Sequence, residues 1–219
     1  MTRTSAIPIA LCVCLCLGSV LAGAADDDSS RILKSIQDRY NHARTLQVSF
    51  TETYTAQGRP RQTESGLLTL RKPGRMRWDY SAPSGKLFVS DGKDVYLYTP
   101  DSKKVEKQPL KASEDMRAPL AFLLGKLDFQ KEFRDFEIKP EGSAFVITAK
   151  AKTDKLPYDG IKLTAAPDFQ IRNLEIRGAD QSVLAFKFDN EKLNPMVNDV
   201  LFKFQMPAGA TLVTAEASQ

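Results

Sequence analysis

The chain has 219 residues, of which 42% are hydrophobic and 26% charged, and its formal net charge at pH 7 is only +4. This length suits one domain with a sizeable core. The two signs of charge are interleaved, which does not favour a nucleic-acid partner.

A secretory signal peptide is predicted at residues 1–24. Arg3 precedes an apolar run over 7–21, and small residues follow at 22–25. Cleavage is expected after Ala24 or Ala25, which leaves a single domain at 25–219 that is exported and soluble. The apolar run is short for a membrane span. Position 24, where a lipoprotein signal would carry cysteine, is alanine, so no lipid anchor is expected there.

All three cysteines, Cys12, Cys14 and Cys16, lie in the segment to be removed. The mature chain is therefore expected to contain neither a disulfide nor a thiol.

One amphipathic helix is predicted first, with Ser29 or Ser30 as its cap after the acidic run 26–28. Its apolar positions repeat at helical spacing and are Ile32, Leu33, Ile36 and Tyr40. From Leu46 the period changes to two, which is typical of a half-buried strand.

Short strand-like runs follow for most of the chain, separated by turn residues such as Pro73-Gly74 and Asp91-Gly92. The regular spacing predicts an all-antiparallel sandwich or barrel. The predicted strands are 46–51, 66–71, 75–80, 87–90, 95–98, 103–108, 133–138, 144–149, 161–164, 171–176, 183–188 and 200–205.

One segment interrupts the strands. Pro119 can begin a helix and Gly125 can end one, and the residues between them are apolar on every side. Such a helix is either buried or faces an apolar partner outside the fold.

The sequence offers little for catalysis. His42 is the single histidine, and its place at the end of the first helix predicts a solvated imidazole there. We find no nucleophile elbow, no phosphate-binding glycine loop and no metal-ligand spacing. We therefore predict no catalytic residue, no metal and no cofactor. A paired-carboxylate hydrolase stays an open alternative, and the basic residues at 71–77 are interpreted as a solvated strand face.

The sequence resembles the LolA family of periplasmic carriers of outer-membrane lipoproteins. The resemblance spans nearly the whole mature chain, and its clearest parts are 71–80 and 89–93. Further matching stretches are 66–68, Tyr98 with Pro100, the helix at 119–125, and the ending from Phe202 to Gly209.

The resemblance implies a mainly β fold: an unclosed antiparallel β-barrel of about eleven strands, with helices forming a lid over an apolar cavity. It also implies a monomer that takes lipoproteins by their acyl chains from an ATP-driven inner-membrane releasing complex and hands them to an outer-membrane receptor. A receptor or a lipoprotein-sensing module of the same fold is the alternative.

The resemblance also implies roles for two residues. Lys72 stands where the family usually has an arginine that latches the lid, and an ammonium cannot reproduce a bidentate guanidinium. Met76 matches an apolar position near the cavity mouth used in taking and handing over lipoproteins. We expect Met76→Glu to keep most of the unfolding free energy while losing lipoprotein capture.

The predicted lipid-binding residues lie on alternating strand faces and on the apolar helix, and a filled core is the alternative interpretation for each of them. They are Phe50, Leu68, Leu70, Met76, Trp78, Leu87, Val89, Leu120, Leu123, Leu124, Phe136, Phe186 and Phe188.

Overall fold

The computed structural model describes residues 22–110, 127–153 and 158–214. They form one 12-stranded sheet with two α-helices and a short 3-10 helix. The strands are β1 (Thr45–Ala56), β2 (Arg59–Arg71), β3 (Arg75–Ala82), β4 (Leu87–Asp91), β5 (Asp94–Thr99), β6 (Lys104–Pro109), β7 (Phe133–Glu141), β8 (Ala144–Ala151), β9 (Tyr158–Ala165), β10 (Ile171–Gly178), β11 (Val183–Leu193) and β12 (Thr211–Thr214).

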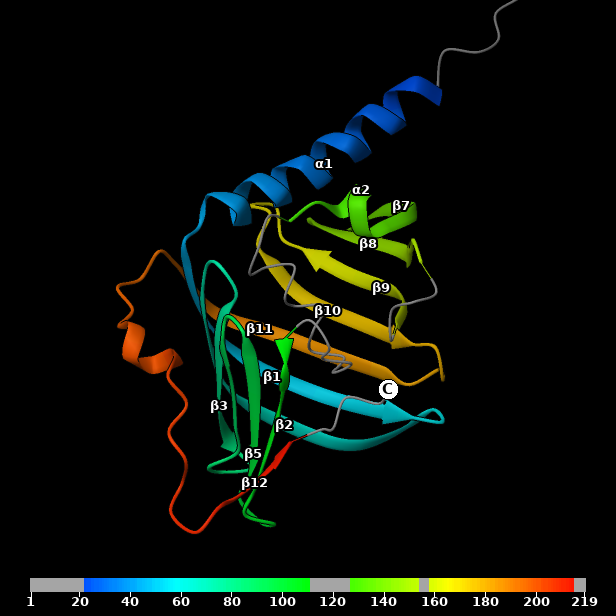
Figure 1. Cartoon of the computed structure of the whole chain (residues 1–219). Coiled ribbons are helices and arrows are strands. Elements are labelled where there is room, and N and C mark those ends of the chain that lie inside the picture. The colour runs from blue at the N-terminus through cyan, green and yellow to red at the C-terminus, as the bar shows by residue number, and fades with distance from the viewer. Residues whose placement is uncertain (1–21, 111–126, 154–157, 215–219) are drawn as a thin grey trace, which may run out of the picture.

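The sheet is unclosed, with β12 and β7 at its two edges and the order β12-β6-β5-β4-β3-β2-β1-β11-β10-β9-β8-β7. All neighbours pair antiparallel except β12, which runs parallel to β6. In Figure 1 β3 and β5 run nearly upright while β1, β2 and β11 run across behind them, so the sheet bends over on itself. The predicted mainly β, unclosed antiparallel fold is confirmed.

The inner face of this bend holds the core. In β1 the buried side chains alternate as Leu46, Val48 and Phe50, which is the period of a strand with one face covered. Trp78 on β3 and Phe186 on β11 have ring centroids 5.5 Å apart although β2 and β1 lie between their strands. Neighbouring strands are spaced by roughly 4.8 Å, so a flat sheet would keep these rings much further apart.

Helix α1 (Ala22–His42) packs Leu33, Ile36 and Tyr40 into the same core. The predicted cap at Ser29 or Ser30 is wrong, because both serines lie inside α1. None of the helices in the described ranges is long and apolar enough to cross a bilayer.

A second apolar layer lies on the outer face of β4 to β6. Phe88 belongs to the inner core, so its neighbour Val89 points to the opposite face, where it is fully buried. The 3-10 helix η3 (Asp199–Phe202) packs on β3 and β4, and Phe202 is only 2% exposed. Phe204 then stacks on Tyr96 of β5 with ring centroids 4.7 Å apart. The C-terminal segment, residues 194–214, thus covers this outer face (Figure 1).

Eleven of the predicted strands are present, but the strand predicted at 200–205 is wrong. Asn198 caps a 3-10 turn there by accepting a hydrogen bond from the backbone N–H of Val200, which starts η3 in place of a strand. The alternating Phe202 and Phe204 cover another strand instead of forming one. The short edge strand β12 was not predicted. The apolar helix predicted at 119–125 lies outside the described residues.

Candidate functional site

The centre of the inner face is a group of aromatic rings. Phe50 meets Trp78 edge-on at 4.7 Å between centroids and Tyr80 at 5.1 Å. Phe186 stacks on Phe188 at 5.8 Å. Edge-on and stacked contacts of this kind stabilise beyond the area that they bury. The only polar atom of Trp78 is satisfied by sulfur, since Nε1 donates to Met76 Sδ at 3.4 Å.

Most of the predicted lipid-binding residues come together here. Phe136 is half-buried and packs against the inner core beside Phe129, with ring centroids 6.5 Å apart. Those buried on the inner face are Phe50, Leu68, Leu70, Met76, Trp78, Phe186 and Phe188. The remaining three predicted residues on the helix, Leu120, Leu123 and Leu124, lie outside the described residues.

The prediction that Leu87 and Val89 bind lipid on the inner face is wrong, because both lie on the outer face. In the register of β3 and β4, Trp78 pairs with Phe88 and Arg77 with Val89, so Phe88 is the inner residue. The run Leu87-Phe88-Val89 is apolar throughout, and a continuous apolar run carries no alternation from which to read the face. Phe88 is an inner-face residue that the prediction missed. Tyr80 lies on the inner face with Met76 and Trp78, as the alternation of β3 predicts, although it is not among the predicted lipid-binding residues.

A polar cluster lies on the same face, nearer the hairpin that joins β1 to β2. It consists of Glu52, Glu64, Tyr80 and Lys86, and both carboxylates are buried. Tyr80 Oη donates to Glu52 Oε2 at 3.2 Å, and Lys86 pairs with Glu64. The alternation of β1 (Leu46, Val48, Phe50) continues to position 52, so the signal for a buried glutamate was present in the sequence.

Lys72 fastens the end of α1 to the sheet. Its Nζ donates to Tyr40 O at 2.6 Å, and its backbone N–H donates to Arg44 O at 2.9 Å. A cation at the C-terminus of a helix also interacts favourably with the helix dipole. Burial lowers the pKa of the Lys72 ammonium. Among the described residues its anchor is α1, and the predicted latching of the lid at 119–125 is not described.

A buried network holds the same end of α1 from the other side. Glu191 of β11 accepts from Arg39 Nη2 and from Tyr40 Oη, each at 2.7 Å. Tyr40 Oη in turn accepts from the backbone N–H of Ile171 at 2.8 Å. Burial, then the neighbouring Glu191 carboxylate, raises the pKa of Tyr40. The sequence showed no signal for this network, because its members are far apart along the chain.

Asn41 connects α1 to the stretch that begins at Leu127, directly after residues 111–126, which lie outside the described ranges. Its amide accepts from the backbone N–H of Leu127 at 2.6 Å and donates to the carbonyl of the same residue at 2.8 Å. Gln37 accepts from the N–H of Phe129 at 2.9 Å, where helix α2 (Phe129–Glu132) begins. Three separate anchors, at Lys72, at Glu191 and at Asn41 with Gln37, thus fasten the helix end of the sheet. This is the end where α1 meets the start of β1 and the end of β2.

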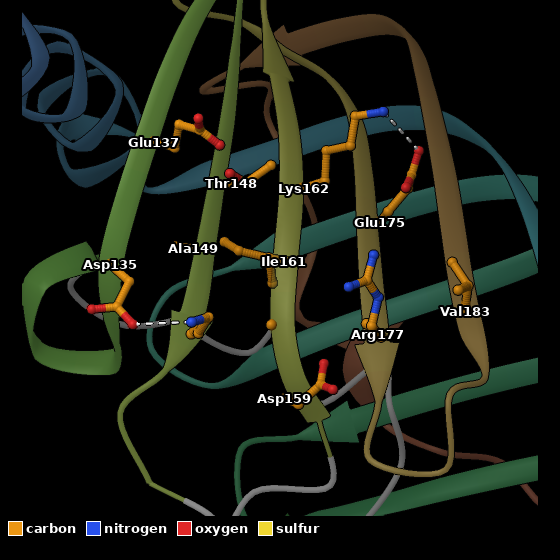
Figure 2. Close-up of a pocket in the computed structure, with 12 residues that line it drawn as sticks. Asp135, Glu137, Thr148, Ala149, Asp159, Ile161, Lys162, Glu175, Arg177 and Val183 are labelled. Atoms are coloured by element: carbon orange, nitrogen blue, oxygen red, sulfur yellow. Dashed lines mark ion pairs between the residues drawn. The ribbon is translucent and has the colours of Figure 1, made fainter.

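The outer face of β7 to β10 carries a hollow of about 640 Å³ (Figure 2). Charged side chains of both signs surround this hollow. Lys150 pairs with Asp135 at 3.4 Å and Lys162 with Glu175 at 3.7 Å. Pairs this long on an exposed face contribute little to stability. We therefore interpret the hollow as a solvated surface and not as a binding or catalytic site.

A second hollow of about 590 Å³ lies beside His42, Arg44 and Met196. His42 is exposed, and its Nδ1 lies 2.6 Å from Asp38 O one helical turn earlier. Its solvated place at the end of α1 agrees with the sequence-based interpretation. In the described part of the chain, no three His, Cys, Asp or Glu side chains are grouped so that they could hold a metal ion.

Comparison with known proteins identifies a matching protein family. Residues 41–205 match the family described as "Outer membrane lipoprotein carrier protein LolA". An outer-membrane lipoprotein carrier protein of Nitrosospira multiformis is 29% identical over 181 residues, covering 82% of this chain and 87% of that protein. One from Pseudomonas putida is 28% identical over 209 residues, covering 95% and 98%. An uncharacterized conserved protein of Thermus thermophilus shares the fold, with a TM-score of 0.50 at 13% identity over 86% of this chain and 99% of that one.

Proposed function

Because the chain belongs to the LolA family of outer-membrane lipoprotein carrier proteins, we propose that it carries lipoproteins through the periplasm from the inner to the outer membrane. The acyl chains of the lipoprotein lie against the inner face of the sheet. Loading comes from an ATP-driven inner-membrane releasing complex, and delivery is to an outer-membrane receptor. No catalytic step is part of this function.

The observation that carries the proposal is the inner face itself. It gathers seven of the predicted lipid-binding residues into one apolar surface, rich in aromatic rings and containing Met76. An acyl chain gains about 0.8 kcal/mol for each CH₂ that leaves water. A bent sheet with this apolar surface on its inner face supplies that burial for a chain that has left its bilayer.

The inner face is closed in the structure, since Trp78, Leu68 and Met76 are all nearly without exposed surface. Acyl chains therefore have to displace side chains that pack on one another. Methionine and ring contacts suit such an exchange, because flexible and planar groups can pack again on a new neighbour.

The energy of loading supports an active partner. Moving a palmitoyl-length chain out of a membrane costs roughly 12 kcal/mol, and three chains exceed the roughly 21 kcal/mol at which non-covalent affinities saturate. A carrier cannot extract such a client by binding alone, so energy enters at the releasing complex.

A direct test uses the mature chain, residues 25–219, with inner-membrane vesicles that contain the releasing complex and a lipoprotein. We expect ATP to produce a soluble complex of chain and lipoprotein that elutes together in gel filtration. The control is the same lipoprotein without its acyl chains, which should stay unbound. Equal binding of both forms, or no soluble complex, would overturn the proposal. Stable residence of the chain in the outer membrane would favour the receptor alternative.

A further inference from the structure

The inner face changes from apolar to polar along β1 to β3. On β1 the inner positions run Leu46, Val48, Phe50 and then Glu52. Glu64 of β2 lies directly opposite Glu52 in the register. The two carboxylates are 6% and 4% exposed, so buried charge interrupts the apolar lining of β1 to β3. The neighbouring strand β11 stays apolar past this depth, with Leu184 opposite Tyr54.

The polar cluster is held by its own contacts. The Lys86 ammonium pairs with Glu64 and lies 4.5 Å from the centre of the Tyr80 ring. Tyr80 Oη donates to Glu52. Gln62 Nε2 also donates to the Glu64 carboxylate. Breaking a buried ion pair leaves a charge without its partner and is strongly unfavourable. An apolar chain end can replace none of these hydrogen bonds, so it cannot enter the cluster without that cost.

We propose that the polar cluster sets the greatest acyl-chain length that the inner face of β1 to β3 accepts. This inference rests on the proposed function. Leu46 lies at the helix end of the sheet, and the six residues from there to Glu52 span roughly 20 Å at the strand rise. Methylenes within that depth contact apolar side chains. Methylenes beyond it meet Glu52, Glu64 and Lys86.

The experiment measures the affinity of the mature chain for synthetic lipopeptides that carry one acyl chain: dodecanoyl, myristoyl, palmitoyl or stearoyl. Each pair of added methylenes should raise the affinity about tenfold while they stay on the apolar lining. The wild-type affinity should stop rising before stearoyl. An affinity that rises evenly over the whole series would overturn the inference.

The variant Glu64→Leu with Lys86→Leu removes both charges together, so neither is left unpaired. We expect it to move the limit to a longer chain and to leave the affinity for dodecanoyl unchanged. The matched control is Lys162→Leu with Glu175→Leu, the same exchange in a cross-strand pair on the outer face, and its limit should equal that of the wild type.

A second variant, Glu64→Gln with Lys86→Met, keeps the side-chain volumes and covers the case in which the leucine variant does not fold. If folded variants keep the wild-type limit, the cluster does not set it and the inference fails while the proposed function stands. If neither wild type nor variants bind any lipopeptide in preference to the unacylated peptide, the proposed function itself fails.

Discussion

The two faces of β4 both bear a buried apolar side chain, but the two faces have different partners. On the inner face Met76, Trp78 and Phe88 contact one another and the core. On the outer face β4, with its buried Val89, packs against η3, which belongs to the chain's own C-terminal segment and carries the buried Phe202. The outer face is covered permanently by a segment of the same chain. The proposed function instead requires the inner face to replace its own packing contacts with acyl chains. Burial alone therefore does not separate structural from functional residues here.

The comparison predicts the largest effect for the outer layer. Phe202→Ala removes a side chain that is 2% exposed, and such a loss costs about 3–5 kcal/mol of unfolding free energy. Urea denaturation measures it, with Val200→Ala, at an exposed position of the same 3-10 helix, as the control. Lipoprotein capture per folded molecule should stay unchanged, and a loss of capture at full stability would break the distinction between the faces.

Met76 tests the inner face. Its side chain is 1% exposed. A glutamate at this position would therefore be buried in the free protein as well, and Met76→Glu should cost several kcal/mol of unfolding free energy, more than the sequence alone suggests. Met76→Leu conserves the volume and should cost less than about 1.5 kcal/mol. We expect this variant to remain folded in urea titrations but to capture lipoprotein more slowly. Capture at the wild-type rate would remove Met76 from the transfer surface.

Lys72 gives a smaller effect on stability. Lys72→Met removes the hydrogen bond to Tyr40 O, and one such bond contributes about 1 kcal/mol. Lys72→Arg tests the family's usual residue at this position and should retain most of the stability. Thermal denaturation of the two variants compares them, and equal stability of Lys72→Met and wild type would show that the anchor contributes nothing.

The smallest effect is expected at alkaline pH. Burial, then the nearby Glu132 carboxylate, raises the pKa of Tyr158 from 10.0 to about 12. The folded state therefore favours the protonated phenol, so its stabilising contribution is complete below pH 10 and is lost as the pH rises to about 12. Tyr158→Phe should flatten the fall in unfolding free energy over this interval, and an unchanged slope would contradict the assignment.

The sequence predicted where the strands lie better than it predicted which parts of the chain pack against them. Period-two alternation identified β1 and β3 and placed Phe50, Met76 and Trp78 on one face, because each has polar neighbours on both sides. It failed at 87–89, where every residue is apolar, and at 200–205, where alternating phenylalanines cover a sheet instead of joining one. The anchors of α1 join residues far apart along the chain, such as Arg39 and Glu191, which are 152 positions apart, and a local pattern carries no signal for them.

In the proposed function, acyl chains lie against the inner face and not the outer one. Photocrosslinking can locate them, with a lipopeptide whose acyl chain carries a diazirine and peptide mapping of the adducts on the mature chain. We expect adducts at inner-face positions of β1, β3 and β11, including Phe50, Trp78 and Phe186. Adducts confined to the outer layer around Val89 and Phe202, or no adducts beyond those of an unacylated diazirine peptide, would contradict it.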